Sequence, residues 1–240
     1  MASSSYHESV WEGVPEGSDP SELELRRGFL LEHAKLLRAR TRTDTRAAAP
    51  GVSGAAAGGA PRSVEKQART RVLDVGCGDG RFAAELQGAG FSVVGVDVAE
   101  EPLRRARSMH PELDVRVVPV DGRWPLDDAS FDVVWAGETI EHVVDTAGWM
   151  SELRRVLRSG GSLLLSTPAH GRVRMLALAL SARRFDAHFD PRADHLRFYS
   201  SRSLTRLLED FGFEQVDVRA AGGLRGARRV LLAAAVRSRF

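Results

Sequence analysis

The sequence predicts an α/β fold built on a mostly parallel, seven-stranded sheet with helices on both faces. The first indication is a regular alternation, from residue 70 onward, of short apolar runs with longer amphipathic stretches. The second is a glycine-rich turn between the first apolar run and the first amphipathic stretch, which is typical of a βα unit that faces a ligand. Strands are expected at 71–75, 91–98, 115–120, 131–136, 162–166, 215–219 and 230–236, with helices at 81–87, 100–109, 149–157 and 201–211.

Composition excludes several classes of protein. Of the 240 residues, 43% are hydrophobic and 28% charged, which is ordinary for a globular chain. The net charge is only +2 and no basic run is interleaved with aromatic residues, so nucleic-acid binding is not expected. The single cysteine, Cys77, rules out an intrachain disulfide and predicts a reducing, cytoplasmic environment. No apolar run reaches the ~20 residues that a transmembrane helix needs.

The chain is expected to have three parts. An N-terminal arm with a helix over 21–40 occupies residues 1–40, and the first 20 of these are rich in Ser, Gly, Pro and Glu and read as loose. Residues 41–69 are rich in Ala and Gly and predict a flexible linker. The α/β domain then spans 70–240. The sequence leaves open whether the arm, with Trp11, covers a ligand or is dispensable.

The glycine loop points to a ligand other than a dinucleotide. Glycines fall at relative positions 1, 3 and 5, as Gly76, Gly78 and Gly80, whereas a dinucleotide fingerprint has them at 1, 3 and 6. The sixth position is Arg81, too bulky for close helix packing. The loop is also acidic through Asp74, which suits a ligand with positive charge and amino groups better than a pyrophosphate. The alternative for such a loop is a tight βα turn with no ligand.

An acid at the end of the second strand strengthens the ligand interpretation. Asp97 lies 23 residues after Asp74, where a carboxylate can accept hydrogen bonds from both hydroxyls of a ribose. The alternative role for Asp97 is a helix cap.

Four segments together resemble one family. They are VLDVGCGDG, GVDV, VDGRWPLDDASFDVVWAGETIEHV and LRRVLRSGGSLLLSTP, which are similar in order and spacing to the class I S-adenosylmethionine-dependent methyltransferases. Within that family the chain is most similar to the subgroup that includes ubiquinone-biosynthesis O-methyltransferases. The resemblance covers about residues 70–236 and implies a Rossmann-like, doubly wound fold and S-adenosylmethionine as cofactor.

The resemblance also implies a role for each position of these motifs. The methionine part of the cofactor would lie against Asp74, Gly76 and Gly78, the ribose against Asp97, the adenine against Val98, Asp121 and Gly122, and the reactive sulfonium near Gly137 and Glu138.

Candidate catalytic and metal-binding groups follow the fourth strand. Glu138, Glu141 and His142 are spaced i, i+3 and i+4, so on a helix they would share a face. Carboxylates and an imidazole that converge in this way could hold Mg2+. The pattern resembles the metal site of small-RNA 3′-terminal ribose methyltransferases, with His195 as a further ligand. The alternatives are that His142 acts as a general base without a metal, or that Glu141 and His142 only stabilise the local helix.

Two further features lie at the ligand edge. His170 follows the fifth strand and is a candidate for substrate contact, or else a solvent-facing loop residue. Residues 171–198 form an insertion with both apolar and basic residues, which we interpret as a lid over the acceptor. The less favoured alternative is an amphipathic segment that rests on a membrane surface.

From the sequence we expect a methyltransferase that transfers a methyl group to a small-molecule acceptor, at oxygen. A metal-assisted RNA ribose methyltransferase and a non-catalytic S-adenosylmethionine-binding module remain as alternatives. The glycine spacing disfavours a nicotinamide oxidoreductase. The acceptor and the oligomeric state are not predicted.

Overall fold

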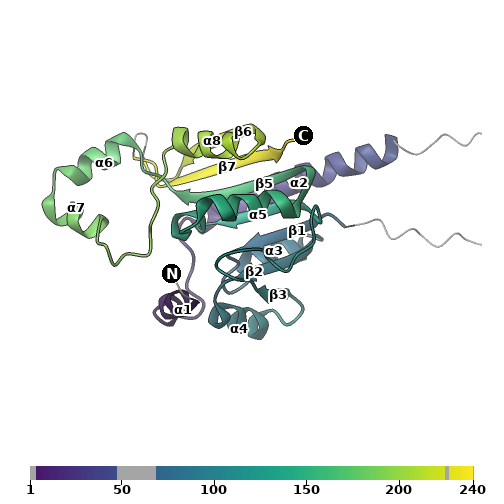
Figure 1. The fold of residues 1–240 in the computed structure, drawn as a ribbon, viewed down its shortest axis with the longest axis horizontal. Helices are drawn as coiled ribbons and strands as arrows, with labels where there is room; N and C mark the ends of the chain where they lie inside the picture. The colour runs from purple at the N-terminus through teal and green to yellow at the C-terminus, as the bar shows by residue number, and fades with distance from the viewer. Residues whose placement is uncertain (1–3, 48–68, 225–226, 240) are drawn as a thin grey trace, which may run out of the picture.

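The seven predicted strands form one twisted sheet. In the computed structural model, which describes residues 4–47, 69–224 and 227–239, the strand order is β3-β2-β1-β4-β5-β7-β6 (Figure 1). Neighbouring strands are parallel except for β7, which runs antiparallel to β5 and β6. The predicted α/β, Rossmann-like fold is therefore confirmed. The strands are β1 (Arg71–Val75), β2 (Ser92–Asp97), β3 (Asp114–Val117), β4 (Phe131–Gly137), β5 (Leu157–Pro168), β6 (Phe213–Ala221) and β7 (Val230–Arg237).

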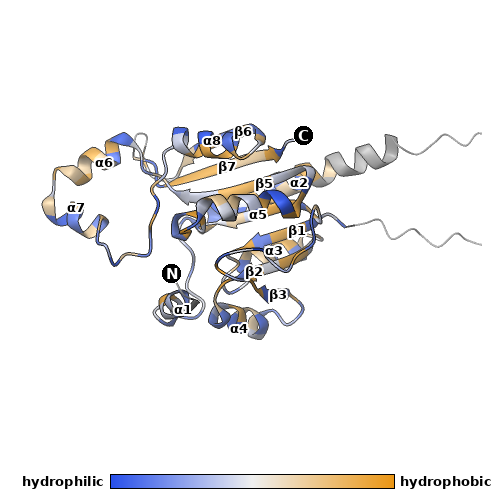
Figure 2. Ribbon diagram, in the orientation of Figure 1, coloured by the Kyte–Doolittle hydropathy of each residue, from blue (hydrophilic) through white to orange (hydrophobic). Residues whose placement is uncertain are grey.

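Helices cover both faces of the sheet because successive strand residues point to opposite sides. Along β4, Val133 and Trp135 pack on one face and Val134 on the other. In Figure 2 the orange of apolar residues runs along β7, which lies between the two helix layers. The Val133 face is covered by α2 (Leu23–Ala47), α3 (Arg81–Gly88) and α4 (Glu100–Met109), and the Val134 face by α5 (Thr146–Val156) and α8 (Ser201–Asp210).

The structure moves one predicted boundary. The sequence predicts a helix as far as residue 157 and a strand over 162–166, with a glycine turn between them. Instead β5 begins at Leu157, which pairs with Phe131, and the register shifts before Val133 pairs with Ser162. Gly160 takes a positive φ of 72° inside this irregularity. The glycines therefore accommodate a distortion of the strand rather than a separate turn.

The N-terminal arm is more ordered than the sequence predicts. Residues 4–12 form α1 (Ser4–Glu12), where a loose segment is expected. The following helix α2 continues to Ala47, past the expected end at residue 40 and into the predicted linker. The remainder of that linker up to residue 68 lies outside the described residues. None of the described helices is both long and apolar enough to cross a membrane.

The insertion after β5 projects from the domain. It contains α6 (Arg172–Ala179) and α7 (Ala182–His188), which extend away from the sheet as a hairpin (Figure 1). Neither helix has a buried residue, and Leu176 and Leu180 are 63% and 82% exposed. The role of this insertion as a lid stays a prediction.

Candidate active site

The site lies where the strand order reverses. β1 has β2 on one side and β4 on the other. After β1 the chain continues toward β2, and after β4 it continues toward β5 in the opposite direction, which opens a crevice at the carboxyl ends of β1 and β4. A cavity of about 250 Å³ occupies this position. It is bordered by the glycine loop after β1, the end of β2, the loop after β3, the segment after β4, and α1.

The glycine loop holds a conformation that other residues would strain. Gly76 and Gly78 have φ values of 69° and 55°. The N–H groups of Gly76 and Cys77 both donate to the carbonyl oxygen of Val96, at 2.8 and 3.0 Å. A Cβ atom on Gly76 would lie 2.5 Å from Oγ1 of Thr139. The predicted tight turn is therefore real, and Gly76 also lines the cavity.

The side chain of Asp97 bonds two backbone segments at the site, and its contact with a ribose stays a prediction. Its Oδ2 accepts a hydrogen bond from the Gly78 N–H at 3.0 Å, and its Oδ1 accepts one from the Ala99 N–H at 3.1 Å, at the start of α4. Asp97 also lines the cavity. Burial raises the pKa of this carboxyl, and the backbone hydrogen bonds oppose that shift. Asp97 thus joins the glycine loop to α4 and faces the ligand space.

The other predicted cofactor contacts divide into two groups. Val98 and Asp121 line the cavity, as expected for residues beside an adenine. Gly122, with a φ of 89°, and Gly137 are not among the lining residues. A Cβ on Gly137 would come within 2.6 Å of an Arg26 nitrogen, so this glycine makes room for a side chain of α2.

Arg26 is a site residue that sequence reasoning missed. It is only 3% exposed, and its guanidinium lies 5.0 Å from the centre of the Phe82 ring. Its charge faces Asp74, Glu138 and Glu141. Its spacing in the sequence could have revealed its burial. Arg26 falls three residues after Leu23 and four before Leu30, so it lies on the same buried face of α2.

Asp74 is buried beside this arginine. Burial raises the pKa of Asp74 to about 7, although the charge of Arg26 lowers it. Its Oδ2 has no hydrogen-bond partner among the described residues. A buried carboxylate oxygen of this kind is suited to an amino group of a ligand. Asp74 does not line the cavity itself but lies at the base of the glycine loop.

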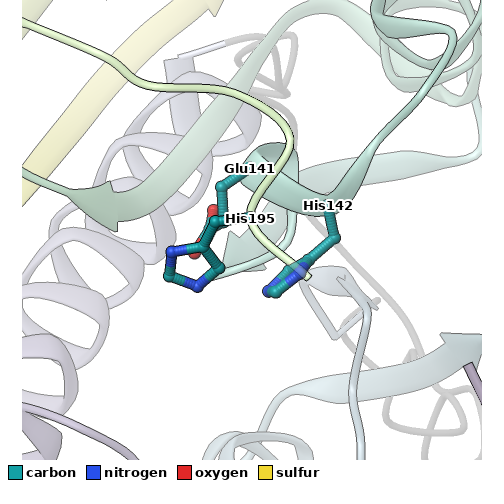
Figure 3. Close-up of side chains that lie close together, drawn as sticks. All are labelled: Glu141, His142 and His195. Atoms are coloured by element: carbon teal, nitrogen blue, oxygen red, sulfur yellow. The ribbon is translucent and has the colours of Figure 1, made fainter. Parts of the chain in front are cut away.

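The sequence predicts that Glu138, Glu141 and His142 share one face of a helix after β4, and this prediction is wrong. Only a three-residue 3-10 helix, η1 (Ile140–His142), forms there, and Glu138 precedes it with a φ of 52°. The Glu138 carboxylate instead accepts a hydrogen bond from Oγ of Ser166 at 3.0 Å. Of the four predicted metal ligands, Glu141, His142 and His195 have ligand atoms within 4.8 Å of one another, and Glu138 is not part of this group (Figure 3). Metal binding stays a prediction.

Glu141, in the middle of η1, is fully buried against β5. Oγ1 of Thr167 donates a hydrogen bond to its Oε2 at 2.9 Å, while its Oε1 has no partner among the described residues. Burial raises the pKa of Glu141 to about 8, and the nearby Glu138 carboxylate adds to the shift. The backbone oxygen of Glu141 also accepts hydrogen bonds from the N–H groups of Leu196 and Arg197, which holds the His195 loop against η1.

His142 is held in one tautomer at the wall of the cavity. Its Nδ1 lies 3.0 Å from the carbonyl oxygen of Asp194, and a carbonyl can only accept, so Nδ1 carries the proton. The lone pair of Nε2 is then free to accept a proton or to bind a metal. Burial lowers the pKa of His142, which favours the neutral ring. The His195 ring packs edge-on at a centroid distance of 4.9 Å.

His170 lies outside the residues that line the cavity. Its ring packs against Phe198 and His188, with centroid distances of 4.9 and 5.4 Å. Burial lowers its pKa to about 4, and the charge of His188 adds to this. The geometry therefore places His170 in an aromatic cluster at the base of the insertion, and its contact with substrate stays a prediction.

One wall of the cavity comes from α1 and from Val14, which follows it. The α1 residues that line the cavity are Tyr6, His7, Val10 and Trp11. Sequence reasoning left the role of this arm open. Contacts between segments this far apart in sequence have no local signature, so no pattern within α1 could reveal them.

The fold and site together define a class of protein. A seven-stranded sheet with a reversed β7, a glycine loop after β1 and a buried acid ending β2 form the architecture of a class I S-adenosylmethionine-dependent methyltransferase. The model of a family described as "Methyltransferase domain" matches residues 34–218. The chain belongs to this family.

Relatives with curated names agree with that assignment. A protein of Mycolicibacterium smegmatis named a probable S-adenosylmethionine-dependent methyltransferase is 38% identical over 146 residues, which is 61% of this chain and 52% of that protein. A ubiquinone biosynthesis O-methyltransferase of Dinoroseobacter shibae is 32% identical over 154 residues, or 61% of each chain. The chain spans about half the length of the mycobacterial relatives that it matches.

Solved structures share the fold. An S-adenosylmethionine-dependent methyltransferase of Methanosarcina mazei aligns with a TM-score of 0.56 and 23% identity, over 72% of this chain and 94% of that one. Phosphoethanolamine N-methyltransferase 2 of Haemonchus contortus, in complex with S-adenosylmethionine, aligns with a TM-score of 0.59 and 19% identity, over 73% of this chain and 50% of that one.

The two acids of the cavity give separable expectations. Asp97→Ala should weaken binding of S-adenosylhomocysteine by about 1–3 kcal/mol and also lower stability, because it removes two backbone contacts. Asp121→Ala, at an exposed position of the rim, should weaken binding with little effect on stability. Calorimetric titration and urea unfolding measure the two quantities. Unchanged affinity in both variants would remove these acids from the cofactor site.

Glu141 should make stability depend on pH. The folded chain raises its pKa from 4.5 to about 8, so the free energy of unfolding falls as pH rises through that range. Glutamine cannot lose a proton. Relative to the wild type, the stability of Glu141→Gln should therefore rise by about 4 kcal/mol between pH 5 and pH 9. Urea unfolding with a chelator present measures this. Glu214→Gln, on the exposed side of β6, is the control, and parallel curves for wild type and Glu141→Gln would contradict the expectation.

Proposed function

We propose that this chain is an S-adenosylmethionine-dependent methyltransferase that methylates a hydroxyl group of a small-molecule acceptor. The observation that carries the oxygen preference is His142, a neutral imidazole with a free Nε2 at the wall of the cofactor cavity. A hydroxyl must lose its proton on methylation, and a positioned base assists that loss. The ubiquinone O-methyltransferase names among the relatives point in the same direction.

The residues of the cavity fit the chemistry of this cofactor. Carboxylates at Asp97 and Asp121 suit hydroxyl and amino hydrogens of a ribose and an adenine, and Val98 offers an apolar surface to a ring. Asp74 and Arg26 present opposite charges near the glycine loop, which suits the amino and carboxylate groups of a methionine. When bound, S-adenosylmethionine supplies a methyl group activated by a positively charged sulfur.

The protein's own part in the reaction is positioning and proton acceptance. The Asp194 carbonyl holds the His142 ring so that Nε2 presents a lone pair. In this proposal Nε2 accepts the proton of the acceptor hydroxyl. Phenolic hydroxyls, with a pKa of about 10, lose this proton more easily than alkyl hydroxyls, so we favour a phenolic acceptor. The largely apolar lining of the cavity disfavours water around this exchange.

A transfer assay tests this proposal. Methyl incorporation from labelled S-adenosylmethionine into 3,4-dihydroxybenzoate, a soluble catechol, should fall by about 100-fold or more in His142→Ala. Affinity for S-adenosylhomocysteine should change little, and His110→Ala, after the end of α4, is the histidine control. Equal turnover by His142→Ala and the wild type would remove His142 as the base. Transfer to total RNA but not to the catechol would favour the RNA alternative.

A second candidate function is metal-assisted methylation of a ribose hydroxyl in RNA. The specific observation is the group Glu141, His142 and His195, with ligand atoms within 4.8 Å of one another. The buried Oε1 of Glu141, without a partner among the described residues, fits a cation-binding role. One carboxylate and two imidazoles suit Mn2+ better than Mg2+, which prefers oxygen ligands. The cation would supply a positive charge that lowers the pKa of an acceptor hydroxyl.

Metal binding is directly measurable. If the group holds a cation, 1 mM Mn2+ should raise the melting temperature, and more so at pH 8.5 than at pH 6.5, because Glu141 must lose its proton to bind. Glu141→Gln should abolish the shift, whereas Glu214→Gln should keep it. Melting temperatures that do not change with Mn2+ or Mg2+ at either pH would leave His142 as a base without a metal.

A further inference from the structure

The cofactor cavity has a wall that belongs to a separate short helix. α1 contributes Tyr6, His7, Val10 and Trp11 to the lining, although it precedes the nearest motif of the site by more than 60 residues of sequence. In Figure 1, α1 lies beside α4 and apart from the other helices. The His7 side chain lies near enough to Asp97 and His142 to interact electrostatically with both.

The first attachment of α1 is a cap on α4 that comes from a distant part of the sequence. The residue before α4 is Ala99, which has no side chain to cap the helix. The carboxylate of Glu8 supplies this function, since it accepts the N–H groups of Glu100 and Glu101 at 2.6 and 3.0 Å. The negative charge also lies at the positive end of the α4 dipole.

The second attachment is Arg105, on the same helix α4. Its guanidinium donates to the carbonyl oxygens of Val14 and Trp11, at 2.7 and 3.0 Å, and so binds the carbonyl end of α1. Arg105 is only 8% exposed, and its charge lies 5.8 Å from the centre of the Trp11 ring. α4 therefore holds α1 at two points.

Between these attachments, Trp11 covers the glycine loop. A Cβ atom on Gly78 would lie 2.8 Å from Cη2 of Trp11, so only a glycine lets the indole ring pack this closely. The same Gly78 donates its N–H to Asp97. Trp11 thus packs on the glycine loop and lines the cavity beside it.

α1 has little stability of its own. It has nine residues, and an isolated helix shorter than about 12–15 residues is marginal in water. Its helical form therefore depends on its contacts with α4 and the glycine loop. Once those contacts break, the segment loses both its position and its structure.

We propose that α1 is a detachable wall of the cofactor site, and that its release from α4 controls the rate at which cofactor enters and product leaves. The inference rests on the cofactor assignment of the proposed function. Glu8 and Arg105 act as positioning residues that hold the wall closed, and Trp11 is the part of the wall that covers the bound molecule.

The rate of S-adenosylhomocysteine release tests this proposal. Labelled S-adenosylhomocysteine is bound to the full chain and chased with an excess of unlabelled compound. Glu8→Ala should accelerate release about fivefold, the factor that corresponds to the loss of a cap worth about 1 kcal/mol. Trp11→Ala should accelerate it further. Glu12→Ala removes the same charge from an exposed position of the same helix and should release at the wild-type rate.

Hydrogen exchange supplies a direct readout of the helix. Amides of residues 6–14 should exchange more slowly when S-adenosylhomocysteine is bound, and this protection should be weaker in Glu8→Ala than in Glu12→Ala. If the wild type binds S-adenosylhomocysteine but Glu8→Ala and Trp11→Ala release it at the wild-type rate, the proposal for α1 is overturned while the cofactor assignment stands. A wild type that does not bind the compound overturns both.

Discussion

The carboxylate of Asp97 is the contact on which the site depends. It holds the Gly78 N–H and the Ala99 N–H at once, and so fixes the glycine loop after β1 relative to the start of α4. Because α4 in turn holds α1 through Glu8 and Arg105, the position of the cavity wall also follows from the end of β2. One buried acid thus couples the ligand loop, a helix of the sheet layer and the N-terminal wall.

Several ionisable groups are buried around this contact, and their burial is costly unless a partner compensates for it. Asp74 and Glu141 have raised pKa values of about 7 and about 8, and both have a carboxylate oxygen without a partner among the described residues. Arg26 offsets part of this cost from below the sheet edge. Buried ionisable groups with shifted pKa values are common at functional sites, and here they lie where the strand order reverses.

Local patterns identified the fold and the cofactor loop. Short apolar runs and amphipathic stretches predicted all seven strands, and the positions of Gly76, Gly78 and Asp97 follow from their place at strand ends. Such features depend on neighbours in sequence, so they can be read from it. The predicted helical face with Glu138 does not form, because Glu138 has a positive φ and η1 is only three residues long. Glu138 instead bonds Ser166 on β5, a contact between distant segments.

What the sequence alone determined is therefore the strands, the class of cofactor and the acids Asp97 and Asp121 that line the cavity, since each follows from a local pattern at a strand or its end. The family resemblance suggested that His195 joins Glu141 and His142, and the tertiary structure brings the three together. Only the tertiary structure placed Arg26 near the acids of the site and laid Trp11 over Gly78. These groups come from the insertion and the N-terminal arm, whose positions are set by packing against the finished sheet rather than by the pattern of their own residues.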